Sequence, residues 1–254
     1  MKLAVSQLAV ASFLKQLEER HLADLRFSEV TRALRALSSA YVERRESALA
    51  DHKALDGAGK RAAFALYYGP LHFLLVQHIV KEIGPALAPG TVVDLGCGTG
   101  VAGAAIAMSA TPPLRVLGVD THPWTLDEAR FTYQAFGLQH DVRRAHAAKT
   151  HFPATTSMMV AAFVVNELND KDRSTLLDRT IRLKADAPLS HVLIVEPISN
   201  RISPWWGDWV AAFERIGGRA DVWKARIDVP PLATRLAKSS GLRPEMLTAR
   251  SLFV

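Results

Sequence analysis

The residues with the clearest chemical potential in this chain of 254 residues form a glycine-rich turn. From Thr91 to Gly103 the chain reads Thr-Val-Val-Asp-Leu-Gly-Cys-Gly-Thr-Gly-Val-Ala-Gly. Three glycines at alternate positions, Gly96, Gly98 and Gly100, leave a turn that no side chain crowds, so that a ligand can contact its backbone. The apolar, β-branched start predicts a buried strand, and the Ala-rich residues 101–108 predict a helix whose first N–H groups point at the ligand. Strand, turn and helix together predict a nucleotide-binding unit.

One carboxylate distinguishes between two nucleotide ligands. The spacing Gly98-x-Gly100-x-x-Gly103 is also the dinucleotide fingerprint, which binds a pyrophosphate at the N-terminus of a helix. Asp94, however, lies just before the first glycine, where its negative charge opposes a pyrophosphate and attracts the ammonium group of a methionine-derived ligand. The charge therefore favours S-adenosylmethionine as the cofactor. The remaining alternative is a structural glycine turn without a ligand.

The run Val93–Gly100 resembles the first motif of class I S-adenosylmethionine-dependent methyltransferases. The resemblance implies that Asp94 and the glycines, with Cys97 among them, hold the amino-acid half of the cofactor. It also implies an α/β fold of the Rossmann-like class I type, with a mostly parallel sheet of seven strands. The apolar strands and helices that alternate after Thr91 agree with this fold class.

Polar residues after the next two strands are candidates for binding the adenosine half. Asp120 ends the second expected strand and follows Gly100 at the spacing of an acid that bonds ribose hydroxyls, with a helix cap as the alternative. His122 either flanks the adenine or only caps and packs locally. After the third strand, many class I methyltransferases carry a polar or acidic residue that reads the adenine, and His146 is the candidate here, with backbone contacts as the alternative.

Asn166 and Glu167 are the candidate catalytic residues. They follow the apolar run Ser157–Val165, read as the fourth strand, and ligands in such sheets bind beyond the carboxyl ends of the strands, where the strand order reverses. We expect Asn166 to orient an acceptor amine or hydroxyl and Glu167 to accept its proton. The alternative is that both residues only close the loop before the next helix. The tetrad Asn-Pro-Pro-Tyr of many exocyclic amine methylases of nucleic acids is absent, which makes that class less expected.

Composition narrows the setting of this site. Hydrophobic residues make up 49% of the chain, enough for a substantial core, and the formal net charge of +6 is compatible with an RNA partner. Cys97 is the only cysteine, which excludes disulfides within the chain and fits a reducing cytoplasm. We expect no metal, because no histidines or carboxylates are paired at ligand spacing, and no membrane, because no apolar run reaches the length of a span.

The first 88 residues are expected to form a helical cap over the substrate, and residues 89–254 the cofactor-binding domain. Apolar residues at helical spacing predict two amphipathic helices, the second capped by Ser28. Its outward face carries Arg32 and Arg35, followed by Arg44 and Arg45; such a face is either solvated or contacts RNA. Tyr68, near the end of the region, is a candidate cofactor contact, with a place in the core as the alternative.

Three further elements are similar to the ribosomal small-subunit methyltransferase-like proteins of mitochondria and bacteria: Val164–Leu168, Val192–Pro197 and Tyr68-x-Pro70. This resemblance implies an association with small-subunit ribosomal RNA. Members often carry a cysteine cluster, which a chain with one cysteine cannot hold. Three hypotheses follow: a methyltransferase acting on RNA, an N- or O-methyltransferase acting on a small molecule or peptide, and a non-catalytic ribosome-assembly factor that keeps the cofactor fold. The oligomeric state is left open by the sequence.

Overall fold

A computed structural model describes residues 2–43, 55–199, 203–244 and 246–254. The chain divides into two compact units. Unit 1 comprises Met1–Leu75 and Ala225–Leu247, and unit 2 comprises Val76–Lys224 and Thr248–Val254. This division differs from the boundary expected at residue 88, because a segment near the C-terminus packs with the N-terminal helices.

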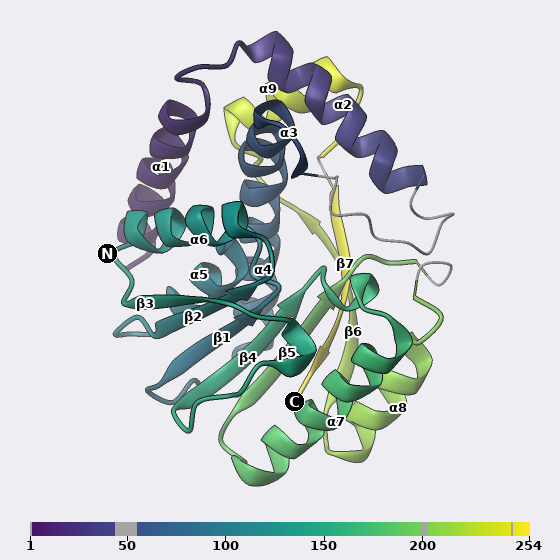
Figure 1. The fold of residues 1–254 in the computed structure, drawn as a ribbon. Coiled ribbons are helices and arrows are strands. Elements are labelled where there is room, and N and C mark those ends of the chain that lie inside the picture. The colour runs from purple at the N-terminus through teal and green to yellow at the C-terminus, as the bar shows by residue number, and fades with distance from the viewer. Residues whose placement is uncertain (1, 44–54, 200–202, 245) are drawn as a thin grey trace. The chain divides into compact units, whose positions relative to one another are not determined.

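A sheet of seven strands in the described part of the chain has the order β3-β2-β1-β4-β5-β7-β6 (Figure 1). The strands are β1 Thr91–Leu95, β2 Arg115–Asp120, β3 His140–Arg144, β4 Thr156–Ala162, β5 His191–Glu196, β6 Arg219–Arg226 and β7 Met246–Phe253. Strands β1 to β5 pair in parallel, and β7 pairs antiparallel with β5. The predicted class I fold with a mostly parallel seven-stranded sheet is confirmed.

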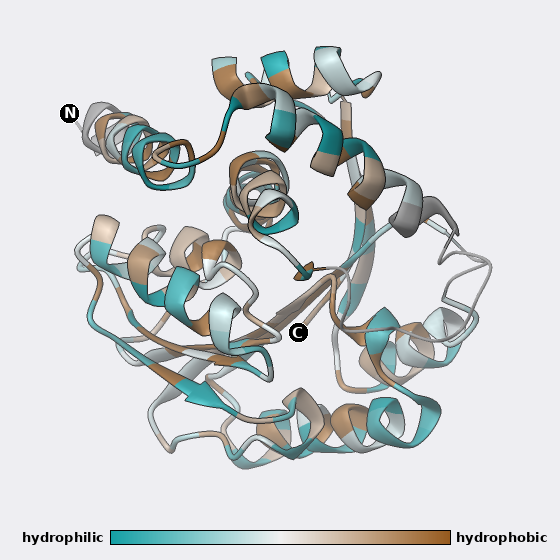
Figure 2. Ribbon diagram, turned by 45° about the horizontal axis from the view of Figure 1, so that its top comes forward, coloured by the Kyte–Doolittle hydropathy of each residue, from teal (hydrophilic) through white to brown (hydrophobic). Residues whose placement is uncertain are grey.

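Helices cover both faces of the sheet, which explains why its central strands β1, β4 and β5 are buried along almost their whole length. Helices α5 and α6 lie on one face and α7 and α8 on the other (Figures 1 and 2). Their bounds are α5 Val101–Ala107, α6 Pro123–Ala135, α7 Asp170–Asp186 and α8 Trp206–Arg215. The strand order reverses between β1 and β4, so the carboxyl ends of these two strands form the position at which such sheets bind ligands.

Strand β4 is shorter than expected. It ends at Ala162, and Val165–Glu167 form a 3₁₀ turn, so the reading of a strand to Val165 was wrong. The physical cause is Phe163, whose φ of 61° is left-handed and breaks the extended backbone. The Phe163 N–H still bonds the Val195 carbonyl at 2.8 Å, which keeps the start of this turn beside β5.

Unit 1 is largely helical in its described part, and the end of β6 and the start of β7 also belong to it. It contains α1 Lys2–His21, α2 Phe27–Glu43, α3 Ala58–Ala63, a π-helix Phe64–Tyr68, the first part of α4 Gly69–Ile83, and α9 Pro231–Ser240. The expected apolar faces of the first two helices are buried, with Phe13 and Leu17 in α1 and Val30 and Leu34 in α2.

Ser28 does not cap α2, since the helix begins at Phe27 and Ser28 lies in its first turn. Glu29 instead accepts the N–H of Arg26 at 2.7 Å. A carboxylate in the first turn of α2 therefore binds the backbone N–H of the residue that precedes the helix. Arg44 and Arg45 fall outside the described residues.

The π-helix that precedes α4 has a local cause in Pro70. Proline has no N–H and cannot continue the α-helical ladder, and the N–H of Gly69 bonds the carbonyl of Phe64, five residues back. The continuous helical stretch Ala58–Ile83 is long and apolar enough to cross a membrane by length and composition alone, which the sequence reading had not expected. Because 67% of its most apolar window is buried inside the protein, it also has the character of a core helix.

Candidate functional site

The glycine turn after β1 packs directly against the turn after β4. Gly96, Gly98 and Gly100 all have positive φ values, of 62°, 52° and 78°. A Cβ atom on Gly96 would lie 2.2 Å from Val164 Cγ2 and 2.7 Å from Val164 Cβ, so only glycine fits at this position. The two turns therefore form one corner at the point where the strand order reverses.

Asp94 lies under the turn rather than in open solvent. Its side chain is 1% exposed, and Oδ2 accepts the N–H of Gly103, in the first turn of α5, at 2.8 Å. Burial raises the pKa of this carboxyl to about 7, although the Gly103 hydrogen bond acts in the opposite direction. Gly103 is itself required by this contact, because a Cβ there would lie 2.8 Å from Asp94 Oδ2.

Gly100 and Cys97 face α6, a relation that the sequence did not reveal. A Cβ on Gly100 would lie 2.9 Å from Ala129 Cα and from the ring of Tyr133, so packing against α6 alone requires a glycine here. The Cys97 thiol is buried beside Gly118 and the same tyrosine, and burial raises its pKa well above the usual value. Cys97 thus contributes packing and its backbone to the turn.

Asp120, the last residue of β2, holds the glycine turn through both carboxylate oxygens. Oδ2 accepts the N–H of Gly98 at 3.0 Å, and Oδ1 accepts the N–H of His122 at 2.9 Å. Asp120 is half-buried and lies beside the glycine turn, which is where an acid that binds the ribose hydroxyls lies in nucleotide-binding folds of this type. Its contact with ribose stays a prediction.

His122 and His146 flank this region from two sides. His122 caps α6: its Nδ1 accepts the N–H of Trp124 at 3.1 Å, which is the local alternative that the sequence left open. His146 follows β3, and its Nε2 lies 3.7 Å from Asp172 Oδ2. Contact of either histidine with adenine stays a prediction.

The donor set of unit 2 fits S-adenosylmethionine. Two buried polar atoms, Thr99 Oγ1 in the glycine turn and His146 Nδ1 after β3, have no hydrogen-bond partner among the described residues. A ligand that carries hydroxyl, amino and ring nitrogen groups can satisfy such atoms. Asp94, Asp120 and the backbone of the glycine turn supply further groups at the same edge of the sheet.

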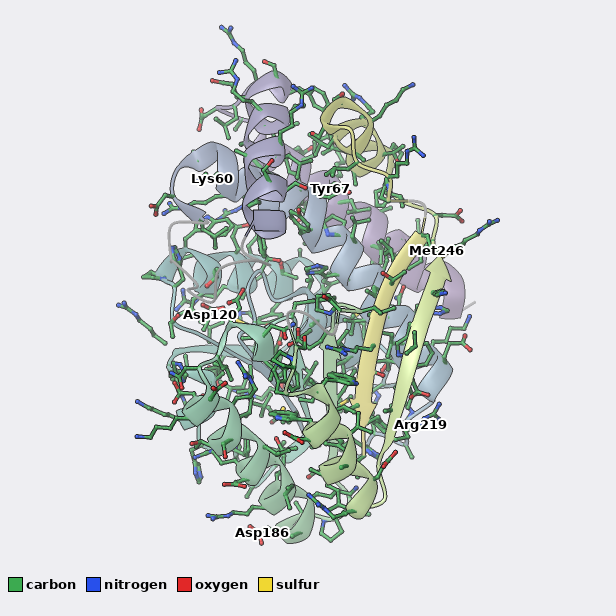
Figure 3. All side chains as sticks on the ribbon, turned by 90° about the vertical axis from the view of Figure 1, so that its right-hand side faces the viewer. Lys60, Tyr67, Asp120, Asp186, Arg219 and Met246 are labelled. Carbon is green, nitrogen blue, oxygen red and sulfur yellow. The ribbon has the colours of Figure 1, made fainter. Side chains whose placement is uncertain are left out.

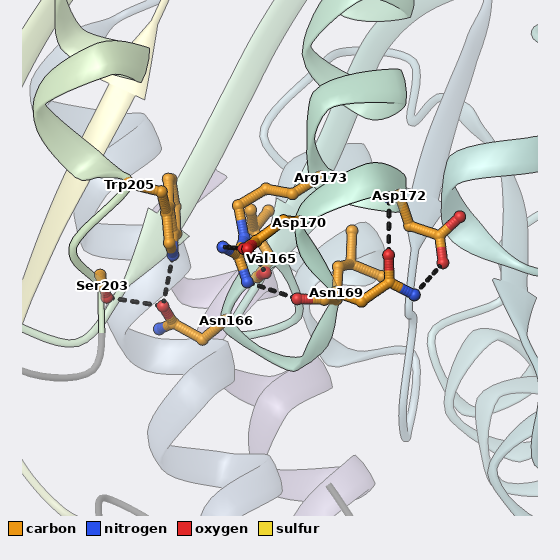
Figure 4. Close-up of polar contacts among 9 residues, drawn as sticks. Val165, Asn166, Asn169, Asp170, Asp172, Arg173, Ser203 and Trp205 are labelled. Atoms are coloured by element: carbon orange, nitrogen blue, oxygen red, sulfur yellow. Dashed lines mark hydrogen bonds and ion pairs between the residues drawn. The ribbon is translucent and has the colours of Figure 1, made fainter. Parts of the chain in front are cut away.

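Asn166 lies in the 3₁₀ turn after β4 rather than directly after the last strand residue, and its side chain is bound within the protein. Its Oδ1 accepts hydrogen bonds from Ser203 Oγ at 2.5 Å and from Trp205 Nε1 at 3.1 Å (Figure 4). Its Nδ2 donates to Glu196 Oε2. Glu167, by contrast, is exposed at the end of the 3₁₀ turn. The catalytic roles of both residues stay predictions.

Glu196 is the residue that sequence reasoning missed. It ends β5, is fully buried, and its Oε1 accepts the N–H groups of Val165 at 2.7 Å and Asn166 at 3.3 Å. Burial raises its pKa to about 8, opposed by these hydrogen bonds and by Arg250, which pairs with it in register on β7. The sequence did contain a signal for this site, because Glu196 directly follows the five residues of the expected fifth strand. The sequence analysis used Glu196 only as part of the resemblance to a family.

Tyr68 belongs to unit 1. It lies in the π-helix, and its ring contacts those of Phe64, Tyr67 and His72 at centroid distances of 5.9, 5.1 and 6.0 Å. The expected cofactor contact of Tyr68 stays a prediction.

Comparisons with known proteins agree with this geometry. A family model described as a methyltransferase domain matches residues 92–186. No curated protein matches the chain in sequence. Mitomycin 7-O-methyltransferase MmcR aligns over 87% of this chain and 67% of its own, with 15% identity and a TM-score of 0.50. An S-adenosylmethionine-dependent methyltransferase from Aquifex aeolicus aligns over 73% and 91%, with 16% identity and a TM-score of 0.46.

The MmcR likeness shows the fold, and the matched domain spans the glycine turn, Asp120 and the turn after β4. Residues 92–186 are therefore a methyltransferase domain on a class I fold, and S-adenosylmethionine is the cofactor of this domain.

Proposed function

We propose that this methyltransferase acts on RNA. The observation that supports the proposal is the distribution of charge between the two units. Unit 1 carries 15 of the 31 lysines and arginines but only 10 of the 25 aspartates and glutamates, so it holds +5 of the formal net charge of +6. A basic surface of this kind attracts a polyanion, and the chemistry of unit 2 requires a methyl acceptor.

Two adjoining helices of unit 1 present this charge. We call the exposed side chains of Arg32 and Arg35 on α2, with Arg235 and Lys238 on α9, the α2–α9 basic face. Arg35 donates to the Ser239 carbonyl, which shows that the two helices are neighbours. Side chains tipped with nitrogen project around both helices (Figure 3). None of the four cations forms an ion pair with a carboxylate of the described residues, so none of the four charges is neutralised there. Arg35 donates to a carbonyl and Arg235 lies over the Phe27 ring, and both contacts leave the positive charge able to attract phosphates.

The measurement that tests this proposal is the salt dependence of RNA binding. Changing all four residues of the α2–α9 basic face to glutamine should weaken binding of total RNA. It should also reduce the slope of log K against log salt by roughly 0.7 to 0.9 for each phosphate that the variant no longer neutralises. The matched control removes four exposed cations from unit 2, with Lys171, Arg182, Arg215 and Lys224 changed to glutamine. Equal losses of affinity in the two variants would contradict a specific RNA face.

Methyl transfer itself is measured with tritium-labelled S-adenosylmethionine and the RNA, protein and small-molecule fractions of a cell extract. Label in RNA supports the proposal, and small-subunit ribosomal RNA is the first species to test, given the resemblance in the turns after β4 and β5. Label only in the protein or small-molecule fraction supports the second hypothesis. RNA binding without label in any fraction supports an assembly factor.

For the reaction, the bound cofactor supplies a methyl group that is already electrophilic on its sulfonium sulfur. The protein then has to align an acceptor and exclude water. We assign the cofactor to the backbone of the glycine turn with Asp94 and Asp120, and the acceptor to the corner beside Asn166 and Glu167. We assign the binding of RNA to unit 1.

A further inference from the structure

We propose that Glu196 fixes the Asn166 amide so that Asn166 offers the methyl acceptor an N–H donor and no acceptor atom. The proposal rests on the methyl transfer assigned above but does not depend on RNA as the acceptor. Glu196 is thereby a positioning residue, and Asn166 is the group that contacts the substrate.

The oxygen of the Asn166 amide is identified by its partners. Trp205 Nε1 can only donate a hydrogen bond, so the amide atom 3.1 Å from it must be the oxygen. The Ser203 hydroxyl donates to the same oxygen at 2.5 Å (Figure 4). An amide oxygen has two lone pairs, and both are used here. Asn166 therefore has no free lone pair with which to receive a substrate N–H.

The nitrogen of the amide faces the buried carboxylate. Asn166 Nδ2 donates one N–H to Glu196 Oε2, while Glu196 Oε1 accepts the two backbone N–H groups of the same turn. An amide nitrogen carries two N–H groups, and the second has no partner among the described residues. Since Asn166 is half-buried at the carboxyl end of β4, this N–H is the group available to a ligand in the corner.

Arg173 holds the opposite side of the turn, so the Asn166 amide is preorganised. Its guanidinium donates to the carbonyls of Val165 at 3.3 Å and of Leu168, and lies 5.5 Å from the centre of the Trp205 ring. Glu196 thus binds the N–H groups of the turn and Arg173 binds its carbonyls. A donor fixed from both sides loses little freedom when a substrate binds.

The fixed polarity selects the chemistry of the acceptor. A lone N–H donor recognises a lone pair, such as that of a hydroxyl oxygen, a carbonyl oxygen or a ring nitrogen. It cannot orient an amine through that amine's own N–H groups, as the sequence reading had expected of Asn166. A proton lost by the acceptor must go elsewhere, and the exposed carboxylate of Glu167 is the neighbouring group in the chain that can accept it.

Exchanging the two functional groups tests the proposal. N166D places a carboxylate against Glu196, and E196Q places an amide nitrogen against the Asn166 amide nitrogen, so each single variant should lower the melting temperature. In N166D/E196Q the new glutamine donates to the new aspartate, and the melting temperature should recover toward the wild-type value. The exchanged pair keeps the hydrogen bond but leaves no N–H on residue 166.

The decisive readout is methyl transfer by N166D/E196Q. We expect kcat to fall by roughly a hundredfold while the affinity for S-adenosylhomocysteine, measured by calorimetry, stays unchanged. The matched control is Q134E, the same amide-to-carboxylate change at an exposed position of α6; its kcat should equal that of the wild type. Wild-type kcat in the exchanged double variant would overturn the donor role, and failure of its melting temperature to recover would overturn the pairing.

The methyl acceptors are the RNA, protein and small-molecule fractions described above. The rate of each variant is measured on the fraction into which the wild-type protein transfers the labelled methyl group. Label outside RNA refutes the proposed RNA acceptor and leaves the donor role to be decided by these rates. Label in no fraction refutes the donor role together with methyl transfer, while the melting temperatures still decide whether Glu196 positions Asn166.

Discussion

Replacing Gly96 by alanine would test whether the glycine turn and the turn after β4 form one rigid corner. The new Cβ would lie 2.2 Å from Val164 Cγ2 and 2.7 Å from Val164 Cβ, and the φ of 62° is left-handed. Both effects act on the same residue, because the side chain collides and the backbone is strained. We therefore expect G96A to destabilise the protein and to displace the turn that carries Asn166.

The two effects can be separated by a control that shares only one of them. A left-handed non-glycine residue costs about 1–2 kcal/mol, and overpacking costs about 1–3 kcal/mol, so G96A should lose roughly 2–5 kcal/mol. Gly137 has nearly the same φ, 66°, but nothing lies within 4 Å of the position that a Cβ would take there. G137A should therefore show the strain alone, partly offset by the lower entropy of its unfolded chain.

Urea denaturation of G96A and G137A measures the difference, and calorimetry with S-adenosylhomocysteine shows whether the corner still binds its ligand. We expect G96A to be less stable than G137A by roughly 1–3 kcal/mol and to bind more weakly. V164A in the G96A background should restore part of this stability, since it removes the 2.2 Å contact and leaves the one at 2.7 Å. Equal stability of G96A and G137A would refute the tight packing of the two turns.

Three further predictions concern single side chains of unit 2. D94N keeps an acceptor for the Gly103 N–H whereas D94A leaves that N–H unpaired, so D94A should be less stable by roughly 1–3 kcal/mol. Both variants should bind S-adenosylhomocysteine more weakly when measured by calorimetry. Unchanged affinity in D94N would show that the negative charge of Asp94 does not contribute to cofactor binding. F163G should be more stable in urea than F163A by about 1 kcal/mol, because only glycine relieves the left-handed φ of 61°; the reverse order would exclude strain. The pKa values of Glu196 and Asp94 in the folded protein, about 8 and about 7, lie above those in the unfolded chain. The folded state therefore binds protons more strongly than the unfolded state, and the stability that these two protonated carboxyls contribute is lost as the pH rises through 7 and 8. The melting temperature of the wild type should fall from pH 6 to pH 9, and an equal fall in E196Q would exclude Glu196 as a cause.

The local sequence was enough to predict the class of protein and one of the two turns that form the corner, the glycine turn after β1. An apolar strand, a glycine turn and an Ala-rich helix are contiguous in the chain, so their pattern and the carboxylate at Asp94 could be read without a fold. Asp120 could be found because one strand and one helix separate it from the turn at a regular spacing. Asn166 became a candidate because a polar residue after an apolar run marks the carboxyl end of a strand, and its role stays a prediction.

What surrounds those residues was decided by the tertiary structure. Glu196 reaches the Asn166 turn only because β4 and β5 are neighbours in the sheet, and Trp205 approaches from a separate segment after β5. The need for glycine at position 100 comes from α6, and the end of β4 comes from the backbone of Phe163. Contacts between residues so far apart in sequence depend on strand order, register and packing, and none of these leaves a periodic signal in the chain.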